Sequence, residues 1–258
     1  MAEKNGTDAA RWAYRRRTSN LFDPASTKPF VLSRTRLENF LRCPRCFYLD
    51  RRLGVDQPAG FPFSLNAAVD HLLKKEFDIY RASREPHPLM KKHRIDAIPF
   101  AHDQLEEWRD TRRGITHLHE PTNLIITGAV DDIWIAPDGE LMIVDYKATA
   151  KDGEVTLDAE WQGGYKRQME IYQWLFRRNR FAVSPTGYFV YVNGKRAADA
   201  FDNRLEFDAK IIPYTGDDAW IEHTVIAAHE ALMGNTIPSS AAECDYCRYR
   251  LVAAEAEK

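Results

Sequence analysis

Two acidic residues and a lysine stand at spacings that could bind a cation. Asp145, Tyr146 and Lys147 close a run of apolar residues that follows a Pro-Asp-Gly turn at 137–139. Side chains alternate along a strand, so Asp145 and Lys147 share one side and Tyr146 points to the other. Carboxylates suit a hard divalent cation, and a nearby lysine can orient water or stabilise developing negative charge. Because the motif is short, the triplet alone is also compatible with a surface ion pair on an edge strand.

Asp131 supplies the second carboxylate, on the preceding predicted strand. It ends the segment Gly-Ala-Val-Asp at 128–131, fourteen residues before Asp145. The Asp-Gly pair at 138–139 is typical of a tight hairpin turn, which folds two strands together. We therefore expect two carboxylates and one ammonium to converge on one patch of a sheet.

Three residues on predicted helices complete the candidates. His71 lies on the margin of an apolar stripe in a helix that Ser64 can cap. Gln168 and Tyr172 are four residues apart, so they share one face of another helix. Taken singly, each of the three is also compatible with ordinary packing or an exposed helix surface.

Taken in order, these residues resemble the motifs of the RecB-like branch of the PD-(D/E)XK nuclease superfamily. That branch shows a helix ending in His, then GxxD, DxK and QxxxY, matched here by His71 and residues 128–131, 145–147 and 168–172. The resemblance implies an α/β fold with a restriction-endonuclease-like core, in which helices flank a central mixed β-sheet.

The resemblance covers most of the chain, from about residue 32 to residue 250. The segment 33–44 is similar to the opening helix of the branch, which precedes a Cys-Pro pair. Asn66 is a departure, because many relatives carry glycine five residues before the histidine.

A divalent metal site is also implied by the resemblance. Asp131, Asp145 and His71 would hold Mg²⁺ or Mn²⁺, with the backbone carbonyl of Tyr146 as a further ligand. A histidine beside carboxylates tilts the preference toward Mn²⁺. Such an ion lowers the pKa of a bound water and clamps a phosphate oxygen.

The resemblance assigns catalytic roles as well. Lys147 would orient the attacking water, while Gln168 and Tyr172 would support Lys147 and contact the nucleic-acid backbone. The implied enzyme is a Mg/Mn-dependent deoxyribonuclease, and our first choice is an exonuclease acting on single strands or duplex ends. Its biology would be DNA repair, mobile elements or CRISPR-related processing. A structure-specific endonuclease, a non-catalytic nucleic-acid-binding module and a redox-sensing module remain open alternatives.

Four cysteines form two CxxC pairs, Cys43 with Cys46 and Cys244 with Cys247. Each pair brings two thiolates within reach of one metal, and together they supply four soft ligands. The ligands alone suit zinc and iron–sulfur equally. RecB-like relatives that carry one cysteine before the nuclease core and three after it bind a [4Fe-4S] cluster. This chain departs from that pattern, because it carries two cysteines at each end, an arrangement that also looks like a zinc knuckle pair. The total of four is kept, so the resemblance favours the [4Fe-4S] cluster, with Zn²⁺ as the alternative. Either metal would join the N- and C-terminal segments of the domain.

Composition limits where the protein can act and how it can bind nucleic acid. The 258 residues are 44% hydrophobic, enough for a full core, and no stretch approaches the ~20 apolar residues of a membrane span. We expect a cytoplasmic protein without membrane partners, because the N-terminus lacks a signal-peptide core. The net charge of −2 argues against a generally basic binder, so DNA contacts must use local patches. The candidates are Arg34, Arg36, Arg42 and Lys166. No helicase motif is present, so a helicase or other processing subunit would be a separate partner.

Hydrophobic periodicity predicts a flexible N-terminal arm over residues 1–30 and one nuclease domain over 31–258. Expected helices lie near 34–42, 45–53, 64–82, 101–112, 163–179 and 217–233, and expected strands near 122–127, 129–136, 140–147, 186–192 and 201–212. This mixture of strands and helices suits an α/β core with a mixed sheet.

Overall fold

The structure is a computed structural model that describes residues 16–58, 60 and 64–258. The chain forms two compact units. The larger contains residues 28–38 and 60–226, and the smaller contains residues 1–27, 39–59 and 227–258. The predicted domain over 31–258 therefore spans residues of both units, and positions 1–15 of the predicted arm lie outside the described residues.

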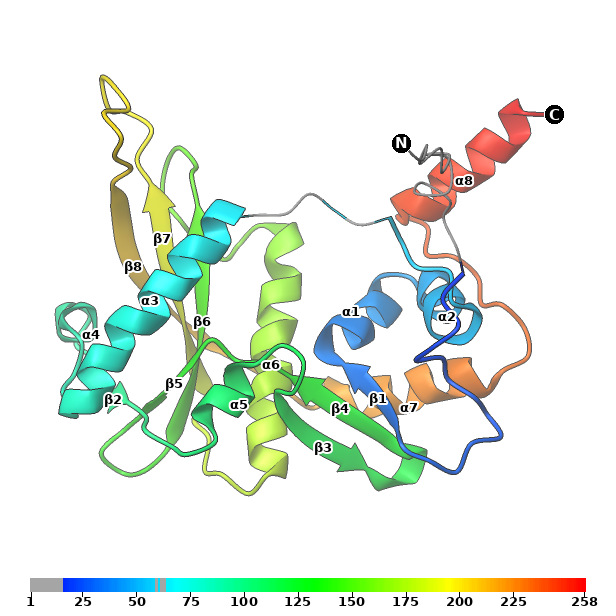
Figure 1. Ribbon diagram of the computed structural model, residues 1–258, viewed down its shortest axis with the longest axis horizontal. Coiled ribbons are helices and arrows are strands. Elements are labelled where there is room, and N and C mark those ends of the chain that lie inside the picture. Colours follow the sequence, from blue (N-terminus) through cyan, green and yellow to red (C-terminus); the bar gives the residue numbers. More distant parts are fainter. Residues whose placement is uncertain (1–15, 59, 61–63) are drawn as a thin grey trace, which may run out of the picture. The chain divides into compact units, whose positions relative to one another are not determined.

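A five-stranded mixed sheet forms the centre of the larger unit, in the order β2-β5-β6-β7-β8 (Figure 1). The strands are β2 (Ile98–Pro99), β5 (Asp132–Ile135), β6 (Leu141–Thr149), β7 (Thr186–Gly194) and β8 (Phe207–Thr215). β6 and β7 are parallel, whereas the other neighbouring pairs are antiparallel. Parallel strands need a crossover, and α6 (Gly163–Arg178) provides it.

The β5–β6 hairpin forms at the predicted Pro-Asp-Gly turn. Gly139 adopts a φ of 92°, and the backbone N–H of Ala136 donates to Glu140 O at 3.0 Å. Asp132 then pairs with Val144. This register sets Asp131 beside the start of the DxK triplet.

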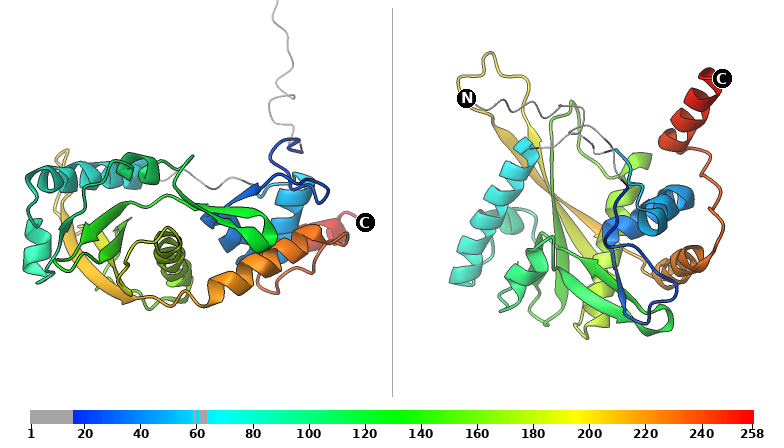
Figure 2. Two further views of the ribbon diagram at one scale, coloured as in Figure 1. Left: turned by 90° about the horizontal axis from the view of Figure 1, so that it is seen from below. Right: turned by 45° about the vertical axis from the view of Figure 1, so that its right-hand side comes forward.

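Two helices contact β6 from its two faces. α3 (Ser64–Ser83) contributes Phe77 to a buried cluster with Val144 and Tyr146 of β6. Side chains alternate along the strand, so Ile143 and Asp145 face the other way, toward α6. Figure 2 shows α6 nearly end-on in its left panel, within the curve of the strands. The two helices thus enclose the strand that carries the DxK triplet.

A three-stranded sheet, in the order β1-β4-β3, completes the larger unit. Its strands are β1 (Phe30–Ser33), β3 (Ile115–His119) and β4 (Leu124–Gly128). α6 also contacts β3 and β4, so it packs between the two sheets. The other helical elements are α4 (Pro88–Lys92), α5 (Leu105–Arg109) and the 3-10 turns Glu120–Thr122 and Glu160–Gln162. α1 (Arg34–Arg42) and α7 (Trp220–Met233) contain residues of both units.

The smaller unit is built on α2 (Pro44–Leu53) and α8 (Asp245–Ala256). Pro44 opens α2, and Gly54 ends it with a φ of 70°. The described part of the predicted arm contacts α2: the backbone N–H of Arg17 donates to Gly54 O at 2.8 Å, and its guanidinium pairs with Asp50 at 2.7 Å.

The predicted fold class is confirmed. The protein is α/β, its mixed sheets are flanked by helices, and the two cysteine pairs join N- and C-terminal segments. Two element boundaries differ from expectation. The helix expected over 101–112 is only α5, and Gly114 turns the chain with a φ of 67°. β8 begins at Phe207 rather than 201, because Asp202 and Asn203 adopt left-handed turn conformations.

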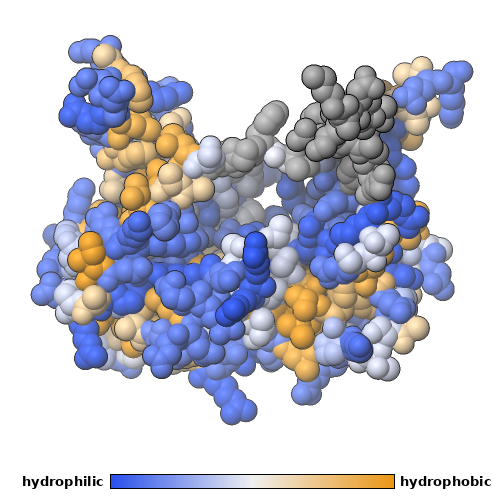
Figure 3. Space-filling model, in the orientation of Figure 1, coloured by the Kyte–Doolittle hydropathy of each residue, from blue (hydrophilic) through white to orange (hydrophobic). Residues whose placement is uncertain are grey.

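An apolar region lies on the face of the larger unit that Figure 3 shows, among hydrophilic side chains. Figure 3 shows apolar side chains gathered over the start of α3 and the β7–β8 hairpin, where Leu65, Leu72 and Phe201 are exposed. None of the helices within the described ranges has the length and apolar character of a bilayer span.

Candidate active site

A cleft of about 410 Å³ opens in the larger unit where α3, β6 and the start of α6 meet. It carries the polar side chains Arg34, Asn66, Asp70, Asp131, Lys147, Tyr165 and Gln168. Pockets of this size hold small ligands. The cleft can therefore admit an ion together with one phosphodiester group.

Lys147, which lines this cleft, forms an ion pair with the buried Asp145. Asp145 is fully buried, and its Oδ1 accepts a hydrogen bond from Gln168 Nε2 at 2.8 Å while its Oδ2 faces the Lys147 ammonium. The ammonium also lies over the ring of Tyr165, 4.5 Å from its centroid. The pair predicted from strand alternation is formed, with a fixed position for each charge.

Electrostatics around this pair favour additional positive charge. Burial raises the pKa of Asp145 to about 6, Lys147 opposes that shift, and the neighbouring charge of Asp131 adds to it. Burial acts to lower the pKa of Lys147, but the two aspartates outweigh it and raise that pKa. The lysine is thus cationic, and a further cation would stabilise the ionised carboxylates.

Asp131 is held beside the pair by both of its carboxylate oxygens. Oδ2 accepts from the backbone N–H of Tyr146 at 3.0 Å, and Oδ1 accepts from Lys74 Nζ at 3.1 Å. The same ammonium donates to Asp70 Oδ2 at 2.8 Å. Asp70 and Lys74 were not predicted from the sequence, although their four-residue spacing on α3 places them on one helix face.

A buried ion network fixes the backbone on the other side of β6. The Tyr146 side chain points away from the cleft, as alternation predicts, and its hydroxyl donates to Asp132 Oδ2 at 2.7 Å. Arg81 and Arg109 pair with Asp132 Oδ1, and Arg109 Nε also donates to the carbonyl of Asp131 at 3.1 Å. The network ties the GxxD strand to the DxK strand. The role of Asp132 was not predicted, because only Asp131 belongs to the GxxD motif.

Gln168 and Tyr172 lie together next to Asp145. Gln168 Nε2 donates both to Asp145 Oδ1 and to the Tyr172 hydroxyl, the latter at 3.1 Å. Burial is the main influence that raises the pKa of Tyr172. The amide thus supports the aspartate, whereas the sequence pattern had suggested support of Lys147.

The second candidate site, in the smaller unit, is a cluster of all four cysteines. Sγ separations are 3.8 Å for Cys43 and Cys247, 3.6 Å for Cys46 and Cys244, and 3.6 Å for Cys46 and Cys247. Thiolates arranged tetrahedrally at about 2.3 Å from one zinc ion stand about 3.8 Å apart. The four sulfurs are therefore spaced for a single metal ion.

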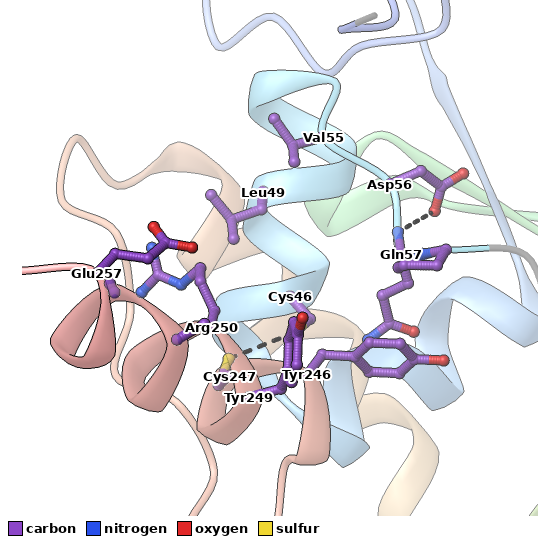
Figure 4. Close-up of a pocket in the computed structure, with 13 residues that line it drawn as sticks. Cys46, Leu49, Val55, Asp56, Gln57, Tyr246, Cys247, Tyr249, Arg250 and Glu257 are labelled. Atoms are coloured by element: carbon purple, nitrogen blue, oxygen red, sulfur yellow. Dashed lines mark hydrogen bonds between the residues drawn. The ribbon is translucent and has the colours of Figure 1, made fainter. Parts of the chain in front are cut away.

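Both cysteine pairs lie at helix N-termini. Cys43 and Cys244 precede α2 and α8 as N-caps, and Cys46 and Cys247 lie in the first turns. Burial acts to raise the pKa of Cys43, but the backbone groups of Cys46 and Ala241 outweigh it and lower that pKa to about 7. The other thiols do not share this shift, because burial raises the pKa of Cys247 to about 11 and also raises the pKa of Cys46. Figure 4 shows an open pocket beside the cluster, lined from α2 by Leu49 and from α8 by Tyr246 and other residues.

Comparison with known proteins assigns a family to this chain. Residues 31–252 match the model of the PD-(D/E)XK nuclease superfamily. The chain belongs to this superfamily. Membership indicates a metal-dependent phosphodiesterase that acts on nucleic acid, and enzymes of this superfamily typically use divalent cations. A search of curated proteins found no match.

One solved structure similar to this superfamily member is titled "Crystal structure of SSO0001". The two are 19% identical, with 86% of this chain and 84% of that chain covered and a TM-score of 0.39. A likeness of this size supports no conclusion about this chain.

In this PD-(D/E)XK chain, some of the site residues predicted from the motifs do not line the cleft. His71 is exposed and is not among the residues that line the cleft, whereas Asp70 is. Successive helix residues are rotated by about 100°, so Asp70 can line the cleft while the next residue lies outside it. Asn66, the departure from the RecB-like pattern, lines the cleft and donates to Ala148 O at 3.0 Å.

The four predicted nucleic-acid-binding residues have different surroundings. Arg34 lines the cleft, and its charge partly offsets the rise that burial causes in the pKa of Asp145. Arg36 is half-buried, and Lys166 lies 5.8 Å from the centroid of the Tyr214 ring. Arg42 is exposed and belongs to the smaller unit. Arg34 is thus the one of the four that lines the cleft.

Proposed function

We propose that the protein is a RecB-like nuclease that hydrolyses DNA phosphodiester bonds with Mg²⁺ or Mn²⁺. The observation that carries this proposal is the buried Asp145–Lys147 pair beside Asp131 in an open cleft. Perturbed pairs of this kind are concentrated at functional sites.

The donor set fits a hard divalent ion. Asp131 and Asp145 would hold it, and the backbone carbonyl of Tyr146 would be a further ligand, since oxygen donors suit Mg²⁺ and Mn²⁺. When bound, the ion would lower the pKa of a water and polarise the scissile phosphate. The expected preference for Mn²⁺ depended on His71, which does not line the cleft, so the carboxylate set alone favours neither ion.

The lysine and the amide position the reacting groups. Lys147 has its ammonium oriented by Asp145 and Tyr165, so it can direct a water toward phosphorus and offset the charge that develops there. Gln168 orients Asp145 through Oδ1 and leaves Oδ2 directed at the lysine. Arg34, at the rim, would contact the substrate phosphate.

An exposed aromatic pair supports single-stranded DNA as the substrate. Trp161 is 65% exposed, and its ring packs edge-on against Tyr165 at 5.5 Å between centroids. Tyr165 lines the cleft and contacts Lys147. An unpaired base could stack on such a surface, whereas the bases of a duplex are already stacked. The frayed end of a duplex offers the same unpaired bases, so duplex ends would be substrates as well.

We propose Zn²⁺ at the four-cysteine site, in place of the [4Fe-4S] cluster that the resemblance favoured. Three of the sulfur separations are 3.6 to 3.8 Å, and all four sulfurs lie within 4.8 Å of one another, which supports one tetrahedral ion. In a [4Fe-4S] cluster each thiolate binds a different iron, so the sulfurs stand farther apart. The metal would stabilise the smaller unit by joining α2 to α8.

The experiment that tests this function is cleavage of matched DNA substrates. The full chain is incubated with Mg²⁺ or Mn²⁺ and with linear single-stranded, circular single-stranded and duplex DNA. We expect degradation of the linear single strand to mononucleotides or short products, and no cutting of the circle. Cutting of the circle would make the protein an endonuclease, and no hydrolysis of any DNA or RNA would reject the enzyme.

A further inference from the structure

We infer that Asp70, rather than His71, is the third metal ligand of the cleft, and that Lys74 occupies the cation position until the metal binds. This inference rests on the proposed nuclease function and names residues that the sequence motifs do not. The ligand it concerns is a divalent cation of the Mg²⁺ or Mn²⁺ type.

Lys74 bridges two carboxylates that could bind one metal ion. Its ammonium lies 2.8 Å from Asp70 Oδ2 and 3.1 Å from Asp131 Oδ1, so one positive charge bridges two carboxylates on separate elements. Two carboxylates drawn together by one cation can also share a metal ion. The Lys74 side chain is only 21% exposed, so the bridge is shielded from the solvent that weakens surface ion pairs.

Helix geometry explains why Asp70 takes this place. Asp70 and Lys74 are one turn apart on α3, and Asp70 lines the cleft with Asp131 and Lys147. His71 is exposed and is not among the residues that line the cleft.

The charges of the cleft explain the role of Lys74. Asp70 and Asp131 line the cleft, and the buried Asp145 interacts with Asp131, which makes three negative charges. Lys147 and Arg34 of the cleft, together with Lys74, can balance them. A divalent ion that entered this balanced site would add two uncompensated charges. If Lys74 leaves its bridge, the ion takes over both carboxylates and the ammonium is free to face a substrate phosphate.

The test is a Mn²⁺ titration followed by electron paramagnetic resonance of the free ion, on full-length protein that keeps its cysteine-bound metal. Asp70→Asn should weaken Mn²⁺ binding by about 10- to 100-fold, because even outer groups of metal sites have effects of that size. His71→Gln should leave the affinity unchanged. Glu76→Gln is the matched control, since it removes one negative charge from the same helix outside the cleft.

Removal of the Lys74 charge should strengthen Mn²⁺ binding, whereas removal of the Asp70 charge should weaken it. Lys74→Met should bind Mn²⁺ more tightly than the wild type, because the ion no longer displaces a cation, whereas Lys74→Arg should stay close to the wild type. A purely structural ion pair predicts weaker binding in Lys74→Met. This measurement also decides the proposal if Asp70→Asn does not fold, as judged by its thermal unfolding.

The outcomes separate this inference from the proposed function. Loss of Mn²⁺ binding in His71→Gln with retention in Asp70→Asn would overturn the inference and leave the nuclease assignment intact. Weaker binding in Lys74→Met would reject the displacement role of the lysine. If Asp145→Asn binds Mn²⁺ as well as the wild type, the metal site of the proposed function is itself wrong.

Discussion

The backbone of Gly128 packs directly against the ring of Tyr172. A Cβ atom at position 128 would lie 2.6 Å from Tyr172 Cε1, closer than such atoms can approach. Gly128 belongs to GxxD and Tyr172 to QxxxY, so the contact links two motifs that are far apart in sequence. Since the Tyr172 hydroxyl accepts from Gln168, the glycine also sets the position of the amide that orients Asp145.

Gly128→Ala should therefore affect both stability and the site. Overpacking of a filled interior costs about 1–3 kcal/mol, and displacement of Tyr172 would move Gln168 away from Asp145. Urea unfolding measures the first effect, and the rate of DNA cleavage measures the second. Gly60→Ala is the control, because a Cβ there meets nothing within 4 Å. Wild-type behaviour of Gly128→Ala would show that the ring can move freely.

Tyr146→Phe tests the buried network behind the DxK strand. The change removes the Tyr146 hydroxyl, which donates a hydrogen bond to Asp132 Oδ2. A buried carboxylate oxygen without its donor costs about 1–3 kcal/mol, so the unfolding free energy should fall by that amount. Mn²⁺ affinity should change little, because the backbone carbonyl and Asp131 remain. Tyr188→Phe is a suitable comparison on the neighbouring strand. Unchanged stability in Tyr146→Phe would contradict the network.

Metal content tests the four-cysteine site. Anaerobically purified protein should be colourless and contain one zinc per chain, and a strong chelator should lower its thermal stability because metal binding and folding are coupled. Cys43→Ser should lower the thermal stability in the same way. The same variant should leave the Asp145–Lys147 pair unaltered. Brown protein with broad visible absorption and bound iron would establish the cluster instead.

Trp161 tests the single-strand proposal. Stacking of one base on an aromatic ring contributes about 1–3 kcal/mol, so Trp161→Ala should weaken single-strand binding by that amount. Trp161→Phe should restore most of it, because the face of the ring is retained. Binding is measured by fluorescence anisotropy with Ca²⁺ in place of Mn²⁺, to prevent cleavage. Equal affinity of the alanine variant would remove Trp161 from the substrate path.

Short-range patterns predicted the strand pair of the site well. The Pro-Asp-Gly turn and period-two alternation placed Asp131, Asp145 and Lys147 on one patch, and the same alternation directed Tyr146 into the core. The cysteine cluster also followed from spacing alone. Each of these inferences depended on residues close in sequence or on matched ligand types.

Helix rotation and long-range contacts could not be predicted. The apolar stripe of α3 does not specify its rotation precisely enough to choose between Asp70 and His71. α8 was missed because it is apolar on several sides, so its residues show no clear periodicity. The contact of Lys74 with Asp131 could not be predicted, because the two residues are far apart in sequence and meet only in the folded protein.

The central claim is metal-dependent hydrolysis by the cleft that holds Asp145 and Lys147. Its most direct test is the rate at which wild-type protein, Asp145→Asn and Lys147→Met cleave one labelled single-stranded oligonucleotide in Mn²⁺. The account predicts cleavage by the wild type that stops on chelation, with a loss of about a hundredfold or more in each variant while both remain folded. Cleavage at the wild-type rate by either folded variant would contradict it.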